Sequence, residues 1–339
     1  MLRLSVLDQS TIVTGRTPAA SIQESLALAR YCEVLGYSRY WLAEHHNSGS
    51  QAGTAPEVLI AAIAATTSRI RVGSAGVMLP HYSSLKVAEQ FRVLEAIAPG
   101  RIDLGLGRAP GSDGRTAFAL NPLADTAAEQ FPAQVRDLLA WVAGERLVEG
   151  HPFRDVVAQP LGPTVPEAWI LGSSDYGAQV AAHFGLPYCF AHFITDGRGA
   201  AEALALYRAR YRPSGRFPEP YAAVCVWALA AESEAEAAQL FTSREVWRLG
   251  RDRGVFLPLP SPEEAMAREF TEEERARVER VRERGIYGTA AVVGERLRGV
   301  AEELRASEIA VLTTVHDPEA RRRSYALLAG EFGCVQNGG

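Results

Sequence analysis

Two adjacent histidines, His45 and His46, are the residues of this chain best suited to carry out chemistry. They follow Glu44 directly after a short apolar run, residues 40–42, that is typical of a β-strand. An imidazole titrates near neutral pH and can therefore donate or accept a proton during a reaction. Because neighbouring side chains on a strand point to opposite sides, we expect one of the two to point into a cleft at the strand end. The alternative interpretation is a pair of satisfied core or surface histidines.

Small residues mark the ends of the next two predicted strands. Ser74-Ala75-Gly76 interrupts the third strand, and Gly105-Leu106-Gly107-Arg108 ends the fourth. The glycines do not form a dinucleotide fingerprint, because Pro110 occupies the third glycine position and no helix is predicted directly after the strand. We interpret them as positions where a flat ligand approaches the backbone. Arg108 offers a planar fork of donors suited to phosphate, with a salt bridge at the rim as the alternative.

A candidate anion site follows the fifth predicted strand, at Gly172-Ser173-Ser174. A helix is predicted from about residue 176 to 184, and the free backbone N–H groups at a helix start bind anions. Capping of this helix by Ser174 explains the serine equally well. Since Arg108 stands at the end of the neighbouring strand, the two features together favour a phosphate site.

Strands and helices alternate along the whole chain, which predicts a parallel sheet with helices on its faces. Strand-like runs begin near residues 3, 37, 69 and 101 and recur at 169–171, 188–190, 223–227 and 309–312. Helical spacing of apolar residues lies between them, as at Phe131, Val135, Leu138, Leu139 and Val142. Eight such strands fit an α/β fold of the (β/α)8 TIM-barrel class, as one domain over residues 1–339, better than an open doubly wound sheet.

An insertion precedes the eighth strand, at about residues 251–285. It joins a proline-containing loop, 257–260, to a charged run, 271–284. A charged run of this kind is typical of a solvated helix. The functional alternative is a lid over the mouth of the barrel.

Composition excludes several classes of function. The net charge of −5, without a basic cluster, argues against a nucleic-acid partner. The four cysteines lie far apart and the two histidines have no evident third ligand, so we predict no metal site. There is no signal peptide and no apolar run of membrane-spanning length, so we expect a cytoplasmic protein without membrane contacts.

The order and spacing of these segments resemble the bacterial luciferase-like, flavin-dependent monooxygenases. The resemblance covers nearly the whole chain and is carried by residues 41–46, 73–80, 100–108, 171–174 and 185–187. It implies a barrel that binds reduced FMN, supplied by a separate flavin reductase, and uses oxygen to oxygenate a small organic substrate. It also implies a homodimer, which we expect to form through helices after the second and third strands that carry Ala61, Ala62, Ala64 and Ala65.

The resemblance assigns roles to single residues. His45 matches the family's catalytic histidine, and the Ala75-Gly76 peptide matches a cis bond beside the flavin. Arg108 matches an arginine near the flavin phosphate, and the Ser173-Ser174 loop matches the phosphate-binding loop. The predicted cofactor-binding residues are Ala75, Gly76, Gly107, Arg108, Gly172, Ser173 and Ser174.

Three departures separate this chain from the luminescent members of that family. No aromatic residue soon follows the histidines, Gly107 stands in place of a reactive cysteine, and Ser173 stands in place of an acid. We therefore do not expect long-chain aldehyde oxidation or light emission. Two alternatives stay open, a deazaflavin-dependent dehydrogenase that transfers hydride without oxygen and a flavin-binding protein without turnover.

Overall fold

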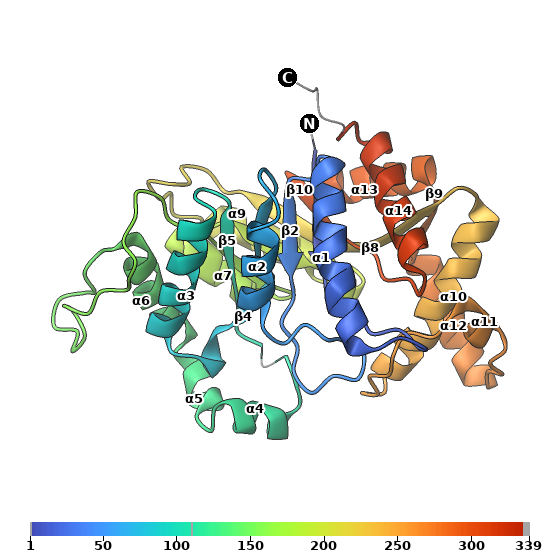
Figure 1. The fold of residues 1–339 in the computed structure, drawn as a ribbon, viewed down its shortest axis with the longest axis horizontal. Helices are drawn as coiled ribbons and strands as arrows, with labels where there is room; N and C mark the ends of the chain where they lie inside the picture. The colour runs from blue at the N-terminus through green and yellow to red at the C-terminus, as the bar shows by residue number, and fades with distance from the viewer. Residues whose placement is uncertain (1, 110, 335–339) are drawn as a thin grey trace.

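Eight parallel strands close into a barrel in the computed structural model, which describes residues 2–109 and 111–334 (Figure 1). In ring order they are β1 (Arg3–Asp8), β2 (Arg39–Leu42), β3 (Arg71–Ser74), β5 (Ile102–Gly107), β6 (Glu167–Gly172), β7 (Tyr188–Ala191), β8 (Ala222–Ala231) and β10 (Glu308–Leu312). The ring closes because β10 pairs in parallel with both β8 and β1. The predicted (β/α)8 barrel is confirmed. Pro110, which argued against a dinucleotide fingerprint, lies outside the described residues.

Helices connect the strands and cover the outside of the barrel (Figure 1). They are α1 (Pro18–Val34), α2 (Pro56–Ala64), α3 (Ser84–Ile97), α4 (Gly114–Leu120), α5 (Ala124–Glu129), α6 (Phe131–Ala143), α7 (Asp175–Phe184), α8 (His192–Thr195), α9 (Ala200–Arg210), α10 (Glu234–Arg251), α11 (Pro262–Met266), α12 (Glu272–Arg284), α13 (Ala290–Glu303) and α14 (Pro318–Glu331). Two short strands that the sequence did not predict, β4 (Val77–Met78) and β9 (Ile286–Thr289), pair with β5 and β8. A 3₁₀ turn, Leu79–His81, follows β4.

The predicted apolar spacing forms the buried face of α6. Phe131, Val135, Leu138 and Val142 are buried against the core. The helix ends where Gly144 takes the left-handed conformation, with φ at 73°, which glycine adopts without steric cost.

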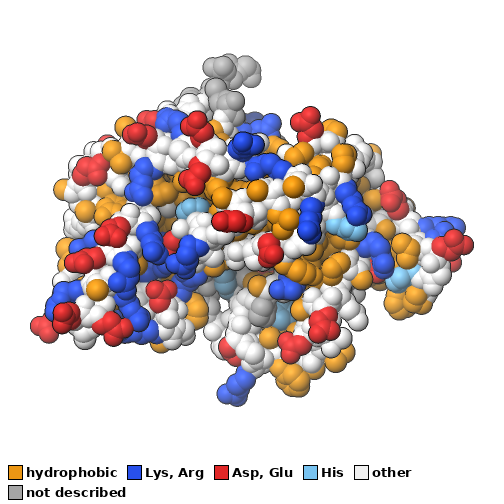
Figure 2. All heavy atoms as spheres, turned by 180° about the vertical axis from the view of Figure 1, so that it is seen from behind, with side chains coloured by type: hydrophobic (Ala, Val, Ile, Leu, Met, Phe, Trp, Pro, Cys, Tyr) orange, Lys and Arg blue, Asp and Glu red, His pale blue; other side chains and the backbone are white. Residues whose placement is uncertain are grey.

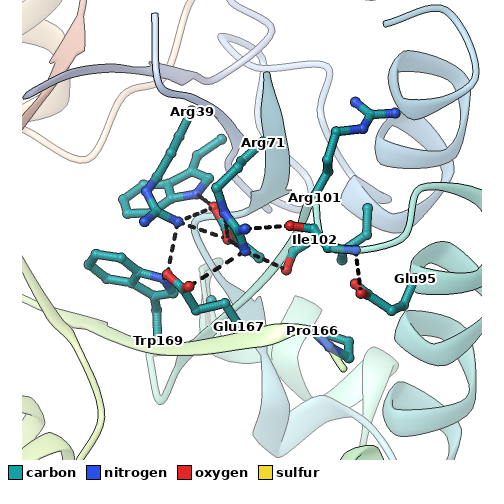
Figure 3. Close-up of polar contacts among 12 residues, drawn as sticks. Arg39, Arg71, Glu95, Arg101, Ile102, Pro166, Glu167 and Trp169 are labelled. Atoms are coloured by element: carbon teal, nitrogen blue, oxygen red, sulfur yellow. Dashed lines mark hydrogen bonds and ion pairs between the residues drawn. The ribbon is translucent and has the colours of Figure 1, made fainter. Parts of the chain in front are cut away.

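A buried ionic network fills the amino-terminal end of the barrel (Figure 3). One nitrogen of Arg39, Nη1, lies 2.8 Å from Asp103 and 3.0 Å from Glu167, and its Nε lies 3.2 Å from Glu308. Arg71 adds a second ion pair to Asp103 at 2.6 Å. Since these residues stand at or near the starts of β2, β3, β5, β6 and β10, the network ties five strands together below the core.

Small residues let β3 and β5 approach each other closely. A Cβ atom on Gly105 would lie 2.1 Å from the carbonyl oxygen of Ser74, and one on Gly73 would lie 2.3 Å from that of Asp103. The Ser74 hydroxyl also donates to the Gly105 carbonyl and accepts from its N–H. The interpretation of Gly105 as a place where a ligand approaches is therefore wrong, because a neighbouring strand fills that space.

The charged run of the insertion forms α12, which is mostly exposed. In this helix Glu274 and Val278 are buried and Val281 packs partly against the core, while most of the remaining side chains face solvent or form ion pairs. Figure 2 shows positive and negative side chains interspersed over the end of the molecule that α11 and α12 form. The prediction of a solvated helix is confirmed. Within the described part of the chain, no helix is long and apolar enough to span a membrane.

Candidate active site at the barrel mouth

A cavity of about 950 Å³ opens at the carboxyl ends of the strands. Such a position is where the loops of a (β/α)8 barrel build active sites. The structure brings every predicted site residue to this cavity, namely His45, Ala75, Gly76, Gly107, Arg108, Gly172, Ser173 and Ser174. Segments that are more than a hundred residues apart in sequence thus share one wall.

Both histidines line the cavity, which corrects the expectation that only one would. Strand β2 ends at Leu42, so the alternation of side chains no longer applies at positions 45 and 46. The Nδ1 atom of His45 is buried and has no hydrogen-bond partner among the described residues. The described residues thus leave one hydrogen bond of this imidazole unmade.

Burial makes His45 a neutral imidazole at pH 7. Desolvation lowers the pKa of His45 to about 4, and the nearby Glu44 carboxylate only partly opposes this shift. From the sequence we expected an imidazole that titrates near neutral pH, and burial in the folded protein shifts this pKa of His45 downward. In this form the side chain can accept a proton or donate a hydrogen bond, but it does not carry a charge.

Glu44 is a buried carboxylate that the sequence reasoning missed as a functional group. Its Oε1 atom lies 2.8 Å from Nε2 of His46 and accepts a hydrogen bond from the Tyr82 hydroxyl at 2.7 Å. Its Oε2 atom accepts the backbone N–H of Met78 at 3.1 Å. The carboxylate thus fixes His46 and joins three segments of the mouth, which indicates a positioning role for Glu44.

The Ala75–Gly76 peptide bond is cis, as predicted. Gly76 packs on the backbone of β5, where an added Cβ would lie 2.8 Å from the Gly105 carbonyl carbon. Ala75 and Gly76 therefore present a wall of backbone and one methyl group to the cavity. A flat ring can stack on such a wall without steric conflict.

The anion site after β6 keeps its donors unpaired. Ser174 occupies the N-cap position of α7, yet its side chain makes no capping hydrogen bond to the described backbone. The guanidinium of Arg108 lies 4.0 Å above the ring of Tyr176, in the first turn of the same helix. Among residues 2–109 and 111–334, Arg108 forms no ion pair. The two alternatives, a salt bridge of Arg108 and a capping hydrogen bond of the Ser174 side chain, are therefore both absent from the described residues. The positive helix start and the guanidinium fit a phosphate.

Helix α10 contributes a group of cavity residues that the sequence reasoning also missed. Arg244, Trp247, Arg248 and Arg251 all line the cavity. Their spacing of three and four residues places them on one face of the helix. That spacing was readable in the sequence, but nothing in it showed which face turns toward the barrel.

The insertion reaches the cavity through the loop before α11. Gly254, Phe256 and Leu259 line the cavity, whereas no residue of α11 or α12 does within the described chain. The N–H of Leu259 donates to the Ile12 carbonyl at 2.8 Å, and its carbonyl accepts from Thr14 at 2.9 Å. The loop is thus fixed across the rim, and the lid that the sequence offered as the alternative for residues 251–285 stays a prediction.

Comparison with known proteins shows the family of this chain. The sequence profile described as "luciferase-like monooxygenase" matches residues 2–314. The chain belongs to the luciferase-like monooxygenase family. A protein of Escherichia coli K12 named luciferase-like monooxygenase is 41% identical over 328 residues, which cover 96% of each chain. The N-acetyl-S-alkylcysteine monooxygenase of Bacillus subtilis is 36% identical over 335 residues, covering 97% of this chain and 98% of the relative.

Solved structures show the same family fold. The crystal structure of apo-MsnO8 superposes with a TM-score of 0.89 at 37% identity and covers 98% of this chain and 99% of its own. At the level of the fold alone, two remote structures match. They are the oxygenating constituent of 3,6-diketocamphane monooxygenase in complex with FMN, with a TM-score of 0.69 at 16% identity, and an F420-dependent secondary alcohol dehydrogenase, with 0.68 at 13%. The family membership makes this protein an oxidoreductase.

The low pKa of His45 predicts a specific pH dependence of stability. A histidine with a lowered folded-state pKa stabilises the fold fully above its unfolded pKa near 6.5, and that contribution is lost as the pH falls toward 4. Between pH 8 and pH 5, the wild type should lose up to about 2 kcal/mol more unfolding free energy than His45→Gln. Urea unfolding of both proteins at the two pH values measures this difference. Parallel losses in the two proteins would contradict the assignment.

Proposed function

We propose that this protein is an FMN-dependent monooxygenase, which takes reduced FMN from a separate reductase and oxygenates a small organic substrate. The proposal rests on one observation, that three features suited to a flavin line the same cavity. These are the anion site of Arg108 and Ser174, the flat wall at Ala75–Gly76, and the unpartnered Nδ1 of His45. When bound, reduced FMN supplies the reaction with oxygen that places one oxygen atom on the substrate.

The residues of the cavity fit an FMN molecule. Arg108, Ser173 and Ser174 would hold the phosphate at the start of α7, where donors and helix dipole both favour a dianion. Ala75 and Gly76 would contact the ring, because they line the cavity with backbone and one methyl group. Gly107 and Gly172 line the cavity between these parts and leave space above the backbone.

His45 would act in the chemistry more than in cofactor binding. Its neutral imidazole can accept a proton at Nδ1, which faces no other hydrogen-bonding group within residues 2–109 and 111–334. His46 cannot take the same role freely, because its Nε2 is bound to Glu44. The apolar part of the cavity wall, including Phe193, Ile194 and Phe256, excludes water from the reaction.

A test of the phosphate site uses Arg108→Ala. Charge-assisted hydrogen bonds contribute roughly 1.5–3 kcal/mol each, so the variant should bind FMN about 10- to 100-fold more weakly. Its affinity for riboflavin, which has no phosphate, should change little. Fluorescence titration with the two flavins measures both constants. Arg115→Ala is the matched control, because Arg115 is an exposed arginine nearby that does not line the cavity.

Equal losses of FMN and riboflavin affinity in Arg108→Ala would remove the phosphate assignment. Titration of the wild type with a deazaflavin, followed by oxygen uptake with chemically reduced FMN, separates the remaining functions. Tighter binding of the deazaflavin would favour the hydride-transferring dehydrogenase. Tight FMN binding with no oxygenated product from any screened substrate would favour a binding protein.

A second test concerns the role of His45. His45→Ala should keep most of the FMN affinity but form product about 10²–10⁴-fold more slowly, because it lacks the group that accepts a proton. Hydrogen peroxide should then replace the oxygenated product. The control is His183→Ala, since His183 is exposed on α7 and does not line the cavity. An unchanged rate and yield in His45→Ala would show that the histidine pair is structural.

We also propose that two copies associate through α2 and α3. Val58 on α2 is 62% exposed, and Val93 and Ile97 on α3 are about half exposed, which leaves an apolar face on these helices. Ala61, Ala62 and Ala65 lie at least partly on the surface of α2 or just after it, but Ala64 packs inside the protomer, which corrects its expected role. Sedimentation that finds only monomer at micromolar concentration would contradict this arrangement.

A further inference from the structure

Two arginines in the wall of the cavity are buried to an extent that is unusual for a charged side chain. Arg244 and Arg248 project from α10 and are only 7% and 6% exposed. Arginine is rarely buried unless acidic groups or hydrogen bonds compensate its charge. The contacts of Arg244 and Arg248 therefore indicate whether their role is structural or one of ligand binding.

Arg244 has no direct partner of this kind. Its guanidinium lies 4.0 Å above the ring of Trp227, and within the described chain it forms neither a hydrogen bond nor an ion pair. Burial and the nearby positive charge of Arg248 lower the pKa of Arg244 well below its usual range. An arginine nevertheless keeps its proton in proteins. The Asp196 carboxylate, which binds Arg248, opposes the lowering of this pKa only in part, and no carboxylate lies at ion-pair distance from Arg244 within the described chain.

Arg248 forms an ion pair, but this pair does not neutralise the combined positive charge of Arg244 and Arg248. It binds Asp196 through two nitrogens, at 3.0 and 2.9 Å, while its Nε is buried without a partner among the described residues. The same carboxylate also lies 3.8 Å from Arg284. Two further facts leave an excess of positive charge. Arg251 lines the same wall, and the acidic residues on the cavity, Glu44 and Asp113, are bonded elsewhere.

This positive group is separate from the proposed phosphate site. Arg108 and Ser174 follow β5 and β6, whereas Arg244 packs on Trp227 of β8, which lies two strands beyond β6 in the ring. Arg244 and Arg248 also border a recess of about 30 Å³ next to the main cavity. A ligand that spans the cavity can therefore place an anionic group here while a flavin phosphate occupies the other side.

We propose that Arg244 and Arg248 form a second anion site, which binds a carboxylate or sulfonate group of the organic substrate. An oxyanion in this place would supply a counter-charge and accept hydrogen bonds from the guanidinium of Arg244, beside the positive charge of Arg248. The substrate class is then an organic anion rather than a neutral molecule. As a statement about substrate, this proposal rests on the proposed function.

The test uses three probes of similar size, hexanesulfonate, hexanoate and hexan-1-ol, titrated calorimetrically into the full-length protein with and without FMN. The wild type should bind the two anions at least about tenfold more tightly than the alcohol. Arg244→Met, which preserves apolar volume, should lose about tenfold or more for the anions and little for the alcohol. Arg277→Met, on the exposed face of α12, is the matched control and should bind all three as the wild type does.

Stability provides a second readout. Removal of an uncompensated buried charge should not destabilise the protein, so Arg244→Met should unfold in urea at a concentration no lower than the wild type. Arg244→Gln, which loses the charge but keeps polar atoms, tests the same point should the methionine variant fail to fold. Loss of anion binding together with retained or increased stability is the signature of a binding residue.

Three results would overturn the proposal. The first is equal binding of the three probes to the wild type, and the second is an equal loss of all three in both Arg244 variants. The third is a loss of FMN affinity in these variants with riboflavin unchanged, which would mean that this site takes the flavin phosphate. FMN titration of the wild type tests the proposed function separately from the second anion site. Absent FMN binding contradicts the proposed function even where the preference for anions persists.

Discussion

The ion network around Arg39 is the constraint on which the rest of the structure depends. Arg39 is surrounded by the carboxylates of Asp103, Glu167 and Glu308, and the first and last of these are fully buried. Loss of one partner from such a network typically costs about 3–5 kcal/mol, because the remaining charges stay buried without compensation. Since the network joins the starts of five strands, it fixes their register, and the register fixes which residues reach the mouth.

Trp41 links this network to the active site. Its indole Nε1 donates to Asp103 at 2.8 Å, and its ring packs edge-on against Trp169 with centroids 4.9 Å apart. Trp41 also lines the cavity above. Trp41 is therefore held in place by a hydrogen bond to Asp103, whose carboxylate is itself paired with arginines. This fixes one wall of the cavity, as chemistry that depends on orientation requires.

Buried charged side chains at the two ends of the barrel differ in how they are paired. At the amino-terminal end, the buried charges of Asp103 and Glu308 are all paired. At the mouth, Nδ1 of His45 and Nε of Arg248 are buried without hydrogen-bond partners in the described structure, and the largely buried Arg244 forms no ion pair there. Unsatisfied buried groups lower stability, so those of residues that line the cavity indicate a site that a ligand completes.

Much of the fold and part of the site could be predicted from the sequence, because both depend on local patterns. Alternating strands and helices predict a barrel, and strand ends in a parallel barrel meet at one mouth, so His45, Gly76 and Arg108 could be placed together. The partners of Glu44 could not be predicted, since Tyr82 lies 38 residues away and only the folded register brings it near. The same holds for Arg244, whose helical face is turned inward by packing against Trp227.

The crystal structure of this protein with FMN bound is the most direct test of the central claim, that the mouth of the barrel is a flavin site with a defined orientation. We expect the phosphate within hydrogen-bond distance of Arg108 and Ser174 at the start of α7, with the flavin ring against the Ala75–Gly76 peptide and within reach of His45. A phosphate bound by Arg244 and Arg248, or a flavin bound outside the cavity, would contradict it.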